Sequence, residues 1–223
     1  MSQISSRVTG TITSPSWVNS AMNSFKVALM VTLLSSSIGI PAAMGLARGR
    51  VPGKAIFYAL FLSPLILPGI ISALAMYFFI AKLKLIGTLT GIVLAHTVLA
   101  IPYVIVVMTS TLKNIDIRME QASYSLGANP FQTFFKITLP LIRPGILTAA
   151  IFAFIASFDE LITALFICGA HAVTLPKKMW DGIRDEMDPT IAAVSALLIL
   201  LAIVLMGGAA FMEKRQKRLA SFI

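Results

Sequence analysis

The amino-acid sequence predicts an all-α protein, a polytopic bundle of membrane-spanning helices. Of its 223 residues, 57% are apolar and only 12% are charged, which is far from the composition of soluble domains. The apolar residues also gather into stretches of about 20 residues or more, the length that crosses a bilayer as a helix. The predicted spans are residues 24–46, 55–80, 90–110, 144–167 and 191–211.

A polar N-terminal segment, residues 1–23, precedes the first span and lacks the apolar centre of a cleavable signal peptide. We expect this segment to lie outside the membrane. The second span carries Pro64 and Pro68. Proline removes a helical hydrogen bond and frees a carbonyl, so we expect a kink in this span.

The segment that joins the third and fourth spans, residues 117–143, is polar and aromatic. Gly127 follows a run that can be helical, and glycine tolerates the left-handed conformation that ends a helix. Asn129 is a favourable N-cap and Pro130 suits the first position of a new helix. The pattern therefore predicts a helix, a sharp turn and a short helix. Aromatic rings at helical spacing share one face of that short helix: Phe131, Phe134 and Phe135.

The fourth span contains an acidic pair, Asp159 and Glu160. A carboxylate at this depth costs at least a few kcal/mol and is tolerated facing a bundle interior or a water-filled cavity. Neighbouring residues on a continuous helix point about 100° apart, so we expect one carboxylate to face a pathway and the other a neighbouring helix. Two roles stay open, contact with a cationic substrate or structural pairing with a polar group. We expect His96 and His171 to be packed or solvated, and we predict no metal site.

The remaining segments flank the fifth span. The external loop 168–190 contains an amphipathic stretch in which apolar residues recur every four positions and Trp180 suits the headgroup level. The apolar residues of the amphipathic stretch are Leu175, Met179, Ile183 and Met187. The basic tail, residues 212–223, follows the fifth span.

Charge fixes the expected orientation and excludes some functions. Lys and Arg are more numerous on the side of segment 117–143 and the C-terminus, which places both in the cytoplasm. The net charge is +9, but the basic residues form no patch with interleaved aromatic residues, so we predict no nucleic-acid partner. The single cysteine, Cys168, excludes a disulfide framework. No nucleotide-binding loop is present, because the glycines at 49–53 lack the required spacing and the following Ser or Thr.

Residues 121–140 resemble the EAA loop of bacterial ABC importer permeases. The pattern of that loop is Glu-Ala-Ala, three residues, Gly, nine residues and Ile-x-Leu-Pro. The second half matches in full from Gly127 onward, with Ile137, Leu139 and Pro140 in place. In the first half Ala122 matches, Gln121 stands at the Glu position and Ser123 at the second Ala. Glu120 lies one position early, and whether it replaces the missing Glu stays open.

The resemblance implies a type I ABC importer permease fold, with catalysis located elsewhere. It implies as partners ABC ATPase subunits, a second homologous permease subunit, a periplasmic substrate-binding protein and membrane lipid. The chain itself is then not an enzyme and needs no cofactor. The Phe rings either fill a groove of the ATPase or pack in part on the permease itself. The expected docking residues are Glu120, Gln121, Ala122, Gly127, Asn129, Pro130, Phe131, Phe134, Phe135, Ile137, Leu139 and Pro140.

Members of this family usually have six spans, and the first of these is missing from the five-span pattern found here. The stretch 12–25 resembles the external segment that joins spans one and two of the family. Either the chain is a five-span variant, or its true start lies upstream; we expect the second.

The run 157–160, Ser-Phe-Asp-Glu, together with 96–103, resembles the spermidine/putrescine (PotC-like) branch of the family. This implies ATP-driven import of a polyamine across the bacterial inner membrane by alternating access. The same architecture could carry an opine, an aminophosphonate or iron. A channel or secondary transporter that uses Asp159 or Glu160 as a cation site is a further alternative. Stretch 175–187 is then either a contact for the binding protein or a helix on the membrane surface.

Overall fold

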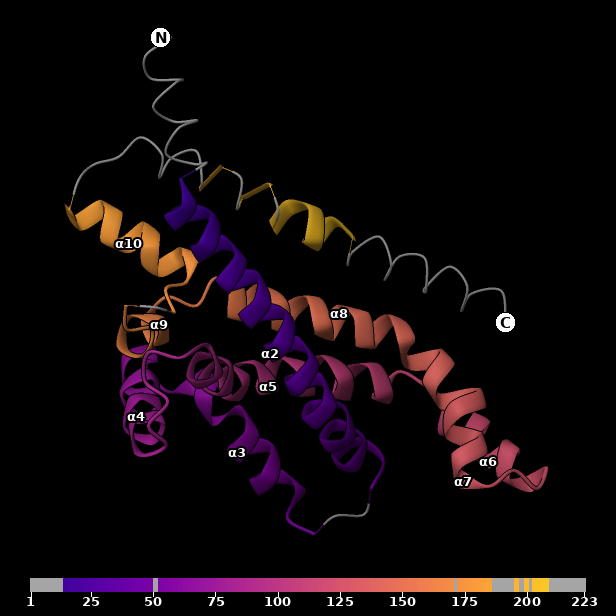
Figure 1. The fold of residues 1–223 in the computed structure, drawn as a ribbon. Coiled ribbons are helices and arrows are strands. Elements are labelled where there is room, and N and C mark those ends of the chain that lie inside the picture. The colour runs from indigo at the N-terminus through magenta and orange to yellow at the C-terminus, as the bar shows by residue number, and fades with distance from the viewer. Residues whose placement is uncertain are drawn as a thin grey trace.

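A computed structural model of the chain describes residues 14–49, 52–170 and 172–185, together with 195–196, 199–200 and 202–208 (Figure 1). The described residues are helical apart from short connections, and this confirms the predicted all-α membrane bundle. In chain order the helices are α2 (Pro15–Arg48), α3 (Lys54–Ile66), α4 (Gly69–Lys82), α5 (Leu89–Lys113), α6 (Ile117–Ser125), α7 (Pro130–Thr133), the π-helical turn η1 (Phe134–Thr138), α8 (Leu139–Phe158), α9 (Ile162–Ile167) and α10 (Leu175–Asp185).

The core lies between α2, α5 and α8, whose buried apolar side chains form one cluster. Small residues let these helices approach closely, as is usual in membrane bundles. A Cβ added to Gly39 of α2 would lie 2.7 Å from Val104 of α5, and one added to Gly145 of α8 would collide with Thr111 of α5. The outer faces of the helices, by contrast, expose many large apolar side chains, as a surface in contact with lipid or another subunit does.

Within the described residues, three helices are long and apolar enough to cross a membrane, or four if the bent pair α3–α4 is one span. The first, α2, begins at Pro15, so residues 15–23 of the predicted N-terminal segment are helical and continuous with the first predicted span. The third predicted span is confirmed as α5. About half of the fifth predicted span, 191–211, lies outside the described residues, and those that are described there are helical.

The second predicted span is two helices. Instead of a kink, α3 and α4 meet at an angle of 104° across a break at Leu67 and Pro68. Pro64 cannot donate to the Leu60 carbonyl, and the Ser63 hydroxyl donates to that carbonyl instead, at 2.8 Å. Two prolines four residues apart therefore end one helix and start another.

The fourth predicted span is also interrupted. The helix that starts at Pro130 continues through η1 and α8 to Phe158, 29 residues in all, and then breaks at Asp159 before α9 begins. At 1.5 Å per residue this helix is about 43 Å long. The expectation of a continuous helix through Asp159 and Glu160 is wrong, and so is the 100° relation between their side chains.

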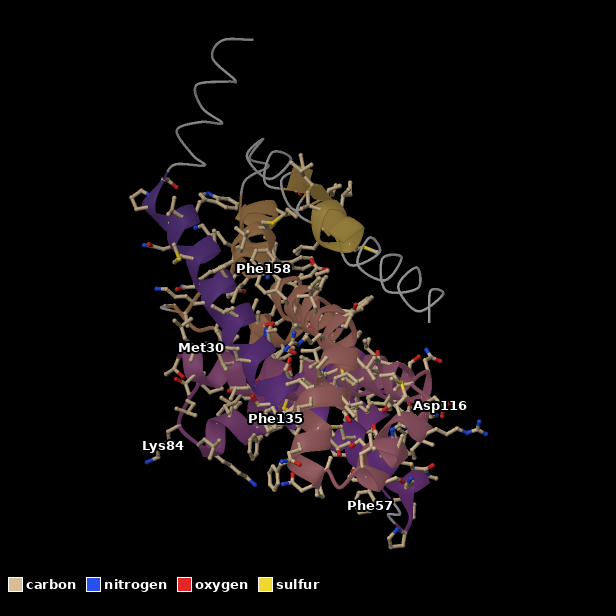
Figure 2. All side chains as sticks on the ribbon, turned by 90° about the vertical axis from the view of Figure 1, so that its right-hand side faces the viewer. Met30, Phe57, Lys84, Asp116, Phe135 and Phe158 are labelled. Atoms are coloured by element: carbon tan, nitrogen blue, oxygen red, sulfur yellow. The ribbon has the colours of Figure 1, made fainter. Side chains whose placement is uncertain are left out.

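The two ends of the bundle carry different segments (Figure 1). α10 lies at the end where α2 begins, and two hydrogen bonds join them: Ser24 Oγ accepts from the Leu175 amide at 2.7 Å, and the Asn23 side chain donates to the Val173 carbonyl at 3.1 Å. α6 and α7 lie at the opposite end. In Figure 2 Phe158 lies below α10, whereas Phe135 and Asp116 lie in the lower half of the molecule.

Candidate functional site

The loop formed by α6, its turn and α7 has the local structure that its sequence predicts. Gly127 has φ +85° and closes α6, with the Gly127 amide donating to the Tyr124 carbonyl and the Ala128 amide to the Ser123 carbonyl. Asn129 then caps α7. Its side chain accepts from the Gln132 amide at 2.8 Å, while the Gln132 side chain accepts from the Asn129 amide at 3.1 Å.

A buried hydrogen bond also joins the two helices of the loop. The hydroxyls of Ser123 on α6 and Thr133 on α7 are hydrogen-bonded at 2.5 Å and both side chains are buried. A serine at the second Ala position of the family pattern thus supplies a bond that alanine could not. Because a buried hydroxyl without a partner is costly, this pair favours one angle between the two helices.

The π-helical turn has its cause in Pro140. Proline has no amide hydrogen, and its ring would collide with the carbonyl four residues earlier, on Lys136. The turn before it widens, and the Leu139 amide donates to the Phe134 carbonyl instead. The loop is therefore joined to α8 without a break in the helix.

Glu120, and not Gln121, ties the loop to the rest of the chain. Its carboxylate accepts from the Thr138 hydroxyl at 3.2 Å and lies 3.7 Å from the Arg48 guanidinium at the end of α2. Arg48 in turn donates to the Ile115 carbonyl at 3.0 Å. Gln121 and Ala122 are both exposed.

The aromatic residues of the loop differ in exposure. Phe131 is 76% exposed and Phe135 is 60% exposed, whereas Phe134 is half-buried and meets Phe135 edge-on at a centroid distance of 5.1 Å. The π turn interrupts the α-helical spacing on which the prediction of one common face relied. Leu126 at the tip of the turn is 88% exposed. Sequence reasoning missed this leucine, although an apolar residue just before a turn glycine is a signal.

The two helix breaks meet at a cavity. It has a volume of about 190 Å³ and lies between the α3–α4 break, α5 and the α8–α9 break. Glu160 lines it, and its Oε1 accepts from the Thr163 amide at 2.9 Å. Asp159 is exposed and is not among the residues that line the cavity. The structure therefore separates the acidic pair, which the sequence could not do.

Sequence reasoning missed the other polar residues of this cavity. Ser72 of α4 is 6% exposed, and its hydroxyl has no hydrogen-bond partner among the described residues. Tyr103 of α5 is half-buried beside it in the lining. The proline break in the second span was the available signal, because irregular backbone at membrane depth is tolerated where it is buried in protein or lines a cavity.

The two remaining predictions concern the histidines and the external helix. His96 is buried as expected, and its Nδ1 is hydrogen-bonded to Ser157 Oγ at 3.1 Å; His171 lies outside the described residues. The amphipathic helix is confirmed as α10. Leu175 is buried with Trp17, Met179 packs against them, and Ile183 is exposed. Met187 lies outside the described residues.

The chain is similar to membrane transport proteins over most of its length. Residues 35–218 match the family model described as binding-protein-dependent transport system inner membrane component. The putrescine transport system permease protein PotI of Escherichia coli (strain K12) is 34% identical over 183 residues, 79% of this chain and 65% of PotI. The chain thus spans somewhat less than two thirds of that relative's length.

Two further relatives carry different names. The spermidine/putrescine transport system permease protein PotC of E. coli (strain K12) is 26% identical over 85% of this chain and 72% of its own length. The molybdenum transport system permease protein ModB of Mycobacterium tuberculosis (strain ATCC 25618 / H37Rv) is 28% identical over 88% of this chain and 80% of its own length.

Solved structures share the fold. The MetNI methionine ABC transporter, in an inward-facing conformation, has a chain that aligns with a TM-score of 0.72 at 21% identity, over 89% of this chain and 95% of that one. A bacterial ABC transporter involved in the import of the acidic polysaccharide alginate aligns with a TM-score of 0.67 at 16% identity, over 97% of this chain and 79% of that one. At these identities the likeness concerns the fold alone.

Proposed function

Because this chain belongs to the binding-protein-dependent transport system inner membrane component family, we propose that it is a transmembrane subunit of an ATP-driven importer for a small organic cation. Its cargo is a polyamine such as putrescine or spermidine, which the names of PotI and PotC support. The chain works with a second permease subunit, a pair of ABC ATPase subunits and a periplasmic binding protein. ATP hydrolysis takes place in the partner subunits.

The proposal is carried by one observation, the unbroken helix that runs from the exposed loop to the cavity. Pro130 begins this helix next to the exposed rings, and Phe158 ends it two residues before Glu160. A helix of this length moves as a stiff rod. Movement imposed on the loop by an ATPase that closes on ATP is therefore transmitted to the acidic break and the cavity beside it.

The loop has the properties of a docking surface. Phe131, Phe135 and Leu126 leave most of their side chains uncovered, on a turn that is held rigid by the capping box and by the Ser123–Thr133 bond. Rigid, exposed aromatic anchors are the residues that dominate binding energy at protein interfaces. We assign this surface to the ATPase groove, with the remaining residues of 117–143 as its support.

The cargo assignment rests on charge. Glu160 brings a carboxylate to a cavity that both polar and apolar residues line. An ammonium group partnered by a carboxylate need not cross an apolar wall unpaired. The similarity to ModB suggests molybdenum as a second candidate cargo. In water at neutral pH, molybdenum is present as an oxyanion. The Glu160 carboxylate would repel such an anion, so we favour the cation.

Orientation completes the proposal. The loop end of the bundle, with the C-terminus, faces the cytoplasm because Lys and Arg are more numerous there. The opposite end, with α10 seated on the start of α2, faces the periplasm. The exposed side chains of Trp180 and Ile183 on α10 are then available to the binding protein.

Copurification of the ATPase subunit tests the docking surface. Replacing Phe131 and Phe135 together by alanine removes two exposed anchors, so we expect the amount of ATPase recovered with the tagged permease to fall at least tenfold. The matched control is Phe152→Ala, since Phe152 lies on the same helix, is 41% exposed and is far from the loop. We expect it to retain the ATPase. Undiminished recovery with the double variant would show that the docking assignment is wrong.

A further inference from the structure

The cavity between the two helix breaks has a composition that matches a particular chemical group. Its polar contributors are Glu160, Ser72, Tyr103 and Thr163, and its apolar walls include Leu65, Leu99 and Ile162. These residues come from α3, α4, α5, α9 and the break between α8 and α9. We propose that this cavity is a binding subsite for one primary alkylammonium group, with Glu160 as the counter-ion and Ser72 and Tyr103 as further partners. The inference rests on the proposed function, because it identifies the part of the cargo that the pathway binds.

The size of the cavity limits the ligand. Its volume of about 190 Å³ is several times the roughly 30 Å³ that a water molecule occupies in the liquid. Pockets for drug-sized ligands are larger, about 300–1,000 Å³. The cavity therefore has room for an ammonium group with a short alkyl chain.

The polar groups are matched to a cation in number and kind. Glu160 Oε1 already accepts from the Thr163 amide, which fixes the carboxylate while its other oxygen keeps its capacity as an acceptor. The Ser72 hydroxyl is buried without a partner among the described residues, so its lone pairs are also available. An ammonium group has three donors and no acceptor, and it satisfies these oxygens better than an anion or a neutral ether could.

The apolar walls suit the remainder of such a ligand. Leu65, Leu99 and Ile162 provide surface for the methylene groups next to the ammonium. Gly69 begins α4 at the same cavity, and a Cβ added there would lie 3.0 Å from Ile162 Cδ1. A larger residue at position 69 would thus push against the wall and reduce the space for the alkyl chain.

Asp159 provides the matched comparison, because it is an adjacent carboxylate that does not line the cavity. The complete transporter, reconstituted in proteoliposomes with its partner subunits, is assayed for ATP-dependent uptake of labelled putrescine. We expect Glu160→Gln to lower the initial rate at least tenfold and Asp159→Asn to leave it within twofold of wild type. Copurified ATPase, equal in both variants, verifies assembly. An equal loss in the two variants, or a loss in Asp159→Asn alone, overturns the assignment.

A second measurement does not depend on the cargo. In the same purified transporter carrying Ala156→Cys, at a half-buried position in the lining of the cavity, methyl methanethiosulfonate modifies the new thiol. The rate is followed by mass spectrometry, and the fully buried Cys168 serves as the unreactive reference. We expect n-butylammonium to slow the modification severalfold, n-butanol to leave it unchanged, and the protection to vanish when Glu160→Gln is added.

The two measurements separate the two claims. If wild type imports putrescine but n-butylammonium gives no protection, the subsite is wrong and the importer stands. If n-butylammonium protects but wild type does not import putrescine, the ammonium subsite stands and the polyamine cargo is wrong. If neither occurs, both are wrong.

Discussion

Glu120 shows how one side chain holds the loop of α6 and α7 in place. It accepts a hydrogen bond from Thr138, which lies in η1, and forms an ion pair with Arg48 at the end of α2. The end of α2, α6 and η1 therefore meet at one carboxylate. The family pattern places its glutamate one position later, where this chain has the exposed Gln121. The identity of the anchoring residue could not be predicted from spacing, because it depends on the position of Arg48 in space.

Substitution of Glu120 tests this anchor. In Glu120→Ala the Arg48 guanidinium, which is 20% exposed, loses its counter-charge and Thr138 loses its acceptor. We expect a loss of about 2 kcal/mol in the free energy of unfolding, because both groups stay largely buried. Glu120→Gln keeps an acceptor for Thr138 and is expected to cost less. Melting temperature in detergent measures both effects.

Gln121→Ala is the control for this experiment. Gln121 is exposed, so its replacement is expected to leave the melting temperature unchanged. If Gln121→Ala destabilises the protein as much as Glu120→Ala, the loop is anchored by something other than the carboxylate.

At the scale of elements, local signals predicted the loop well and the cavity poorly. Gly127, Asn129 and Pro130 act on their immediate neighbours, so the turn that they form could be predicted from sequence. The break at Asp159 could not be predicted, because the apolar stretch that contains it is long enough to cross a membrane as one helix. The cavity joins Ser72, Tyr103 and Glu160 from distant parts of the chain, and no periodicity in the sequence relates them.

The long helices depend on glycine for their packing, and two glycines make a matched test. A Cβ at Gly145 would collide with Thr111 of α5, whereas a Cβ at Gly45 of α2 has no heavy atom within 4 Å. We expect Gly145→Ala to destabilise the protein by about 1–3 kcal/mol through overpacking. Gly45→Ala is expected to be neutral or to stabilise it by roughly 0.5–1 kcal/mol, since alanine favours the helix.

Thermal unfolding of the two glycine variants in detergent measures the difference. A lower melting temperature for Gly145→Ala and an unchanged or higher one for Gly45→Ala is the expected order. Equal melting temperatures would mean that α5 and α8 do not pack as closely in the protein as this structure describes.

At the scale of the whole molecule, the described part of the chain has different surfaces at its two ends. One end carries the exposed aromatic loop, and the other carries α10 on the start of α2. The helix from Pro130 to Phe158 extends from the loop to the acidic cavity. Composition and apolar length were enough to predict the membrane bundle. The connection between the loop and the cavity could not be predicted, because it depends on a helix that continues through Pro140 and ends at Phe158.

The most direct test of this account is transport by the purified complex. The complete transporter in proteoliposomes, supplied with its binding protein, is assayed for uptake of labelled putrescine with and without ATP, and with the membrane potential set or collapsed. We predict accumulation that requires ATP and the ATPase subunits and is retained without a potential. Uptake by this chain without the ATPase, driven by the membrane potential alone, would contradict the account and identify a secondary transporter.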